Sequence, residues 1–179
     1  MKFFTLLNAL FIIALWFLQT AHAEEANAEY KIKAGYLYNF TKFITWPEDN
    51  SETFNLCIVG DDPFGDLINP IEQRSAFGHS IKLFRQKQFN REQRCHIIFI
   101  SASIKDISIL KEVMQTQNNV YPLTVGENQD FAIQGGMIGF VKRQGRIQLQ
   151  INQKLLQQNK LKISAKLLEV AEIVEGEER

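Results

Sequence analysis

The turn Gly60-Asp61-Asp62-Pro63-Phe64-Gly65 is the local motif in this sequence that most resembles a ligand-binding loop. It follows an apolar run and precedes a helical segment, which is where phosphate-binding loops occur. It lacks the lysine of a Walker loop and the third glycine of a dinucleotide fingerprint, and its two carboxylates would repel phosphate. Asp61 and Asp62 are therefore candidate contacts for a small ligand or a cation. The alternative is a plain turn in which Asp62 caps a helix that begins at Pro63.

The residues that could support catalysis or metal binding do not form a recognised set. No serine lies in a G-x-S-x-G nucleophile motif. His79 follows a glycine turn and is expected to be exposed, whereas His96 lies in an apolar run and is expected to be a core or edge histidine. No pair of residues has the C-x-x-C or H-x-x-x-H spacing of a zinc site. We therefore expect no enzyme activity, no metal and no cofactor.

The first 23 residues have the three parts of a secretory signal peptide. Lys2 gives a positive start, residues 3–18 are almost wholly apolar, and Ala21-His22-Ala23 offers small residues to a signal peptidase. The alternative is a membrane anchor, but the apolar run falls just short of the ~17–25 residues that span a bilayer. We predict a cleaved leader at residues 1–23 and an exported, periplasmic domain at residues 24–179, with no membrane insertion of the mature chain.

The predicted export bears on whether the two cysteines are free thiols or a disulfide. Cys57 and Cys95 both lie in the mature part of the chain. An even number of cysteines in an oxidising compartment favours a disulfide over free thiols. The alternative is two separate buried thiols that pack as small apolar side chains.

The apolar periodicity predicts the elements that must hold these residues. Helices are expected at residues 30–44, 63–73 and 163–174, with another opened by a capping box at residues 103–106. Strands are expected at residues 54–59, 80–85, 95–100 and 123–125, and a hairpin at residues 137–142 and 146–151. This order predicts an α/β fold, with one domain, a mixed β-sheet flanked by helices, and a C-terminal β-hairpin and helix.

The charge balance bears on the class of partner. The chain has 20 basic and 20 acidic residues and a formal net charge of zero. A nucleic-acid-binding protein normally has a basic surplus that neutralises phosphates. We therefore expect no nucleic-acid partner.

Six segments, in order and spacing, resemble the YfiR-like family of periplasmic proteins, and together they cover residues 30–174. The segments are Lys33–Phe40 with Thr45-Trp46-Pro47; Leu56–Gly60 with Pro63-Phe64-Gly65; Cys95–Ser101; Leu123–Gly126; Gly135–Ile138; and Ile151-Asn152 with Leu161–Leu168.

The resemblance implies a non-enzymatic regulator. Members are similar to a periplasmic repressor that binds the sensor domain of an inner-membrane diguanylate cyclase, lowers cyclic-di-GMP and limits biofilm formation. The resemblance also implies a homodimer and places the family's disulfide at Cys57 and Cys95. Some members have a second cysteine pair around the glycine-rich segment, but residues 130–138 contain no cysteine here. A single structural bridge is therefore expected instead of a redox switch with two bridges.

Partner surfaces centre on apolar and aromatic anchors. Ile151, Leu155 and Leu156, at the end of the hairpin and just after it, are our candidates for the partner-facing patch. The alternative is that they pack in the core. The second functional hypothesis is a periplasmic small-ligand-binding protein that uses the Gly60–Gly65 turn.

Overall fold

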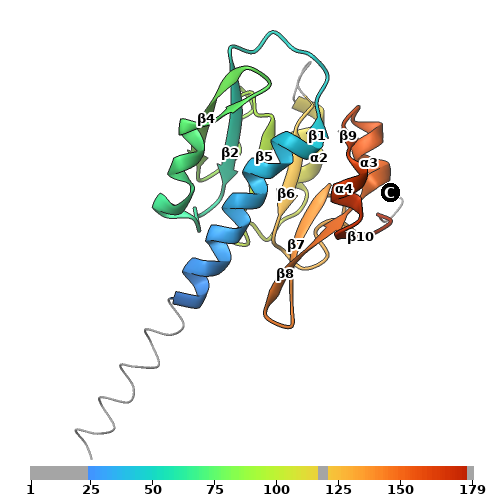
Figure 1. The fold of residues 1–179 in the computed structure, drawn as a ribbon. Coiled ribbons are helices and arrows are strands. Elements are labelled where there is room, and N and C mark those ends of the chain that lie inside the picture. Colours follow the sequence, from blue (N-terminus) through green and yellow to red (C-terminus); the bar gives the residue numbers. More distant parts are fainter. Residues whose placement is uncertain (1–23, 117–120, 177–179) are drawn as a thin grey trace, which may run out of the picture.

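A computed structural model describes residues 24–116 and 121–176 of the chain, so the predicted leader lies outside the described residues. A helix at residues 24–43 comes first (Figure 1). The elements after it are β1 (Ile44–Thr45), β2 (Thr53–Val59), the 3-10 helix η1 (Gly65–Gln73), β3 (Ser75–Ala76), β4 (His79–Gln86), β5 (Ile97–Ile100), α2 (Ile109–Thr116), β6 (Leu123–Gly126), β7 (Ile138–Arg143), β8 (Arg146–Ile151), α3 (Gln153–Gln158), β9 (Lys162–Ile163), α4 (Ala165–Leu168) and β10 (Ala171–Ile173).

A mixed sheet organises the fold. Within the described residues it has eight strands in the order β10-β8-β7-β6-β5-β2-β4-β3. Strands β4, β2, β5, β6 and β7 are parallel, and β8 returns antiparallel to β7 through a tight hairpin. Gln144 and Gly145 both have positive φ in that hairpin, which is the geometry of a type I′ turn. The predicted fold class and hairpin are confirmed.

Alternating side chains of the central strands face two separate cores. Ile97 and Phe99 of β5 pack under the N-terminal helix, which crosses the front of the sheet in Figure 1. Ile98 and Ile100 pack on the other face, against Leu110 of α2 and its neighbours. Both faces of β5 are therefore apolar, as expected for a parallel strand that is covered on both sides.

The N-terminal helix is confirmed, and its buried face agrees with the predicted one in part. Phe40 and Ile44, just after the helix, are buried as predicted, whereas Ile32, which was predicted on the same face, is 51 % exposed. Lys33 and Leu37 are buried in its place. Lys33 pairs there with Glu127, a residue far along the chain.

Three local predictions are wrong. Ser103–Asp106 is not a capping box, because α2 begins only at Ile109 and Asp106 instead accepts a hydrogen bond from the backbone N–H of Ser108. Asp62 does not cap a helix, because η1 begins at Gly65. The helix predicted at residues 163–174 is divided into α4 and the strand β10, because residues 171–173 pair with β8. The short helix α3 was not predicted.

The glycine-rich segment after β6 makes room for one aromatic ring. Phe131 is buried, and its ring lies directly against the Cα atoms of Gly126 and Gly136. A Cβ atom at either glycine would collide with the ring. The two glycines are therefore required by close packing.

Candidate functional site

A cavity of about 420 Å³ opens at the amino ends of β2 and β5. Four parts of the chain form its wall: the segment after β1, the start of β2, the turn between β3 and β4, and the residue before β5. The lining residues are Thr45, Trp46, Pro47, Glu48, Asp49, Phe54, Phe77, His79 and His96. Its volume is within the usual range for small-molecule sites, ~300–1,000 Å³. We call this cavity the amino-edge pocket.

Three aromatic rings form one wall of the amino-edge pocket, and we call them the aromatic wall. The ring centroid of Trp46 lies 5.2 Å from that of Phe54 and 5.7 Å from that of Phe77, and Phe54 lies 5.8 Å from Phe77. Phe77 has a φ of 54° and is 50 % exposed. Phe77 and Gly78 both have positive φ and form the two-residue turn between β3 and β4. Positive φ is uncommon for an aromatic residue, and the ring contacts offset part of its cost.

His96 lies behind the aromatic wall with both ring nitrogens hydrogen-bonded. Its Nδ1 accepts from the backbone N–H of Asn55 at 2.9 Å, and its Nε2 lies 3.0 Å from Oδ2 of Asp49. Since Nδ1 is the acceptor, the proton of the neutral ring sits on Nε2 and is donated to Asp49. The ring also stacks on Phe54 at 4.5 Å. The expected core histidine is thus found, with no free nitrogen for catalysis.

Burial and hydrogen bonding determine the protonation states of His96 and Asp49. Burial lowers the pKa of His96 and outweighs the attraction of Asp49, which acts in the opposite direction. Burial acts to raise the pKa of Asp49, but hydrogen bonds from Ser51 together with His96 leave that pKa below its usual value. At neutral pH the pocket therefore contains a neutral imidazole beside an ionised carboxylate.

The lowered pKa of His96 predicts a pH-dependent stability. The unfolded chain takes up a proton near pH 6.5, whereas the folded ring resists it, so the free energy of unfolding should fall as the pH drops below that value. For one proton, the free energy of unfolding changes by at most ~1.4 kcal/mol per pH unit. Urea unfolding between pH 5 and 8 should show this pH dependence, and His96→Asn should remove it.

His79→Asn is the matched control, because it changes an exposed histidine of the same pocket. This variant should keep the pH dependence of the parent. An unchanged pH dependence in His96→Asn would contradict the assignment to His96.

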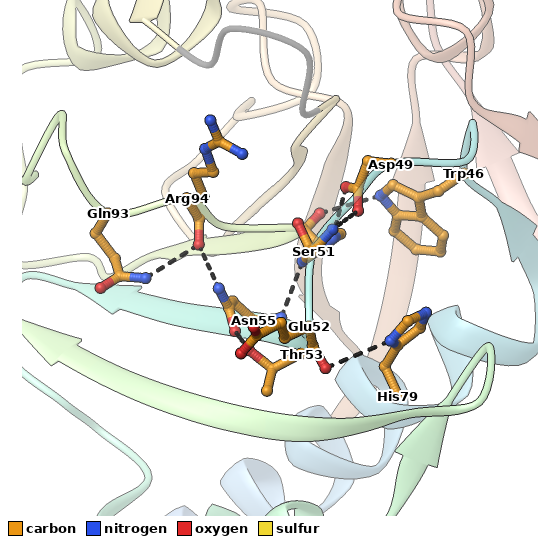
Figure 2. Close-up of polar contacts among 10 residues, drawn as sticks. Trp46, Asp49, Ser51, Glu52, Thr53, Asn55, His79, Gln93 and Arg94 are labelled. Atoms are coloured by element: carbon orange, nitrogen blue, oxygen red, sulfur yellow. Dashed lines mark hydrogen bonds and ion pairs between the residues drawn. The ribbon is translucent and has the colours of Figure 1, made fainter.

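A disulfide anchors the amino-edge pocket from the other face of the sheet. Cys57 and Cys95 are joined, with a Cα–Cα distance of 5.9 Å, so the predicted pair is present. Asn55 also links β2 to the segment before β5, because its side-chain amide donates to the carbonyl of Arg94 at 2.8 Å (Figure 2). Trp46 donates from its indole nitrogen to the carbonyl of His96 at 3.2 Å. The chain around His96 is therefore bound to β2 by covalent and hydrogen bonds.

The Gly60–Gly65 turn lies at the opposite, carboxyl end of β2. Asp61 forms an ion pair with Lys87 at 2.6 Å, and Asp62 forms one with Arg85 at 2.6 Å. Asp62 also accepts from the backbone N–H of Phe64 at 2.8 Å, which is a local turn hydrogen bond. Both carboxylates are therefore paired with cations, Asp62 with Arg85 of β4 and Asp61 with Lys87 just after it, and the geometry does not favour the small-ligand hypothesis at this turn.

A buried ion-pair cluster joins the N-terminal helix to the same carboxyl edge of the sheet. Lys33 lies 2.6 Å from a carboxylate oxygen of Glu29 and 2.6 Å from one of Glu127. The other oxygen of Glu127 accepts from the backbone N–H of Ala102 at 3.2 Å. Burial and the charges of Glu127 and Glu29 raise the pKa of Tyr30 to about 12. Sequence reasoning missed this cluster, because its members are far apart in the chain and a single lysine carries no motif.

Comparison with protein-family models identifies one family. The model described as YfiR/HmsC-like matches residues 30–172. The chain belongs to the YfiR/HmsC-like family. The predicted resemblance is confirmed, and at the level of the family the protein is a periplasmic regulator of cyclic-di-GMP signalling. Comparison with curated proteins found no match.

The candidate partner residues of this YfiR/HmsC-like protein occupy different environments. Ile151 and Leu156 are both completely buried in the core, so neither presents a surface in this conformation. Leu155, on α3, is only partly buried and packs at the margin of the core. Exposed apolar side chains occur nearby in sequence, at Val170 and Ile173, which are 68 % and 48 % exposed. The partner hypothesis therefore remains a prediction for Leu155 and is extended to these two residues.

Two further observations describe the YfiR/HmsC-like chain. Among residues 24–116 and 121–176, no helix is both long and apolar enough to cross a membrane. In the same residues, no three histidine, cysteine, aspartate or glutamate side chains are grouped in a way that could hold a metal ion.

Proposed function

We propose that this protein is a periplasmic repressor that binds the periplasmic sensor domain of an inner-membrane diguanylate cyclase and holds the cyclase inactive. Membership of the YfiR/HmsC-like family supports this role. The expected consequence is lower cyclic-di-GMP and less biofilm. A repressor of this kind acts by contact, so its essential feature is an exposed surface with apolar anchors.

The edge of the sheet at β10 supports a location for that surface. β10 is the last strand of the sheet on this side, next to β8, and its outer edge has no partner strand among the described residues. Val170 and Ile173 are exposed there, and Figure 1 shows α3 and α4 beside β10. We define Leu155, Val170 and Ile173 as the C-terminal edge. Exposed edge strands with apolar side chains are common sites of protein association.

Charge at the C-terminal edge should abolish the interaction without unfolding the protein. The double variant Val170→Asp/Ile173→Asp places two charges on exposed positions, so its stability should stay close to that of the parent. Its affinity for the purified sensor domain of the partner cyclase should fall by at least about a hundredfold, since two anchors are lost. Calorimetric titration measures the affinity, and cellular cyclic-di-GMP should rise to the level of a deletion strain.

Ile32→Asp is the matched control, because Ile32 is an equally large apolar residue, is 51 % exposed and lies on the N-terminal helix. It should bind and repress like the parent. If the double variant folds and still represses while Ile32→Asp does not, the surface is misplaced. If neither the parent nor any variant binds the sensor domain, the proposed partner is wrong.

We also propose export with removal of residues 1–23, and a homodimer as the assembled form. Amino-terminal sequencing of the protein from the periplasmic fraction should begin at Glu24. Light scattering of the same sample should give twice the mass of the processed chain.

A further inference from the structure

We propose that the amino-edge pocket binds an organic cation, namely an amidinium or guanidinium group joined to a small apolar body. The inference is independent of the cyclase and of the C-terminal edge. It rests on three properties of the pocket: its volume of about 420 Å³, its aromatic wall and the sign of its charges.

The carboxylates that line the pocket give it a negative charge. Glu48 and Asp49 line it, and no lysine or arginine does. Glu48 is exposed and makes no ion pair within the described part of the chain. His96 adds no positive charge, because its Nδ1 accepts the backbone N–H of Asn55 and cannot take a proton without losing that bond. A positively charged ligand would therefore find the exposed carboxylate of Glu48 and the carboxylate of Asp49, which accepts hydrogen bonds from Ser51 and His96; His79 is the other titratable side chain in the lining.

The aromatic wall fits the rest of such a ligand. Trp46 and Phe77 contact one another at 5.7 Å between ring centroids and line the cavity, so an apolar body can pack against them. The faces of aromatic rings also attract cations, and tryptophan does so most strongly. Phe77 is half exposed, and its positive φ, together with that of Gly78, belongs to the two-residue turn that joins β3 to β4. This tight turn places the ring of Phe77 at the cavity.

A ligand series of one shape and three charges tests the proposal. The protein is titrated calorimetrically with benzamidine, a cation, with neutral benzamide and with anionic benzoate. Benzamidine should bind at least about tenfold more tightly than benzamide, because only the cation gains the ring and carboxylate attractions. Benzoate should not bind. Equal affinity for benzamidine and benzamide, or binding of benzoate, would overturn the proposal.

Two variants test whether benzamidine binds in the amino-edge pocket, and both should fold. Glu48→Gln removes one exposed charge and should weaken benzamidine binding by about tenfold. Phe77→Asn removes one ring of the wall, and asparagine tolerates positive φ, so it should lower affinity while the unfolding midpoint is unchanged or higher. Glu52→Gln is the matched control, because Glu52 is an exposed acid four residues away that does not line the cavity. Benzamidine binding that is unaffected by Glu48→Gln and Phe77→Asn would overturn the proposal.

The natural cation can be a free small molecule or the arginine side chain of a protein. Agmatine represents the first source and the blocked tripeptide acetyl-Gly-Arg-Gly-amide the second. The compound that binds more tightly shows whether the natural cation is a small molecule or an arginine side chain. Failure of both to bind would overturn the assignment of a guanidinium ligand.

Discussion

Reduction of the Cys57–Cys95 disulfide is expected to lower the free energy of unfolding by about 4 kcal/mol, since the bridge closes a loop with a sequence separation of 38. The bridge restricts the unfolded chain, so breaking it gives that chain more conformations and favours unfolding. Urea unfolding with and without a thiol reductant measures the difference. The midpoint should move to markedly lower urea in the reduced protein.

The variant Cys57→Ala/Cys95→Ala is the control for this measurement. It should be destabilised like the reduced parent, and its unfolding midpoint should no longer respond to the reductant. Alkylation without reductant should label neither cysteine in the parent, because both sulfur atoms are in the bridge. A parent protein whose midpoint is the same with and without reductant would show that the bridge contributes nothing to stability.

Lys33→Met is expected to lower the free energy of unfolding by about 3–5 kcal/mol, the cost of breaking a buried ion pair by removing one partner. The side chains of Lys33 and Glu127 are each only 5 % exposed, so water screens neither of them. Without the ammonium group, the carboxylate of Glu127 stays buried with only neutral donors, the backbone N–H of Ala102 and the hydroxyl of Tyr30. The urea midpoint of Lys33→Met against the parent measures this loss.

Two variants separate a buried charge effect from a simple loss of a lysine. Lys33→Met/Glu127→Met removes both charges and should recover part of the stability, since an apolar pair of similar volume often replaces a buried ion pair well. Lys142→Met is the matched control, because Lys142 also pairs with Glu29 but its side chain is 45 % exposed. It should unfold close to the parent midpoint. If Lys33→Met were no less stable than Lys142→Met, the cluster would not tie the helix to the sheet.

The amino-edge pocket should depend more on the disulfide than on the cluster around Lys33. The disulfide lies next to His96, so its loss should loosen the amino-edge pocket first. The cluster around Lys33 lies at the carboxyl edge of the sheet, on the far side of β2 and β5 from that pocket. Benzamidine affinity should therefore respond more to reduction than to Lys33→Met, when each is compared under conditions in which the protein is folded.

Local sequence patterns identified most strands and the family. The continuous apolar runs at β2 and β5 and the hairpin at Gln144-Gly145 depend on neighbours in the chain, so periodicity and turn chemistry could predict them. The cysteine pair could be predicted because the predicted export and an even count limit the choices. The same approach failed at Ser103, whose hydroxyl accepts from the backbone N–H of Asp61, and at residues 163–174, where pairing with β8 decided the outcome.

The amino-acid sequence by itself therefore determined the α/β class, the order of the main strands, the family and the single disulfide. Tertiary structure decided which face of the N-terminal helix is buried, because the partner of Lys33 is Glu127, far along the chain. It also decided that Ile151 and Leu156 are core residues and that β10 is a strand, since both depend on the long-range packing and pairing of β8. The amino-edge pocket has the same origin: its wall joins four segments that only the folded sheet brings together.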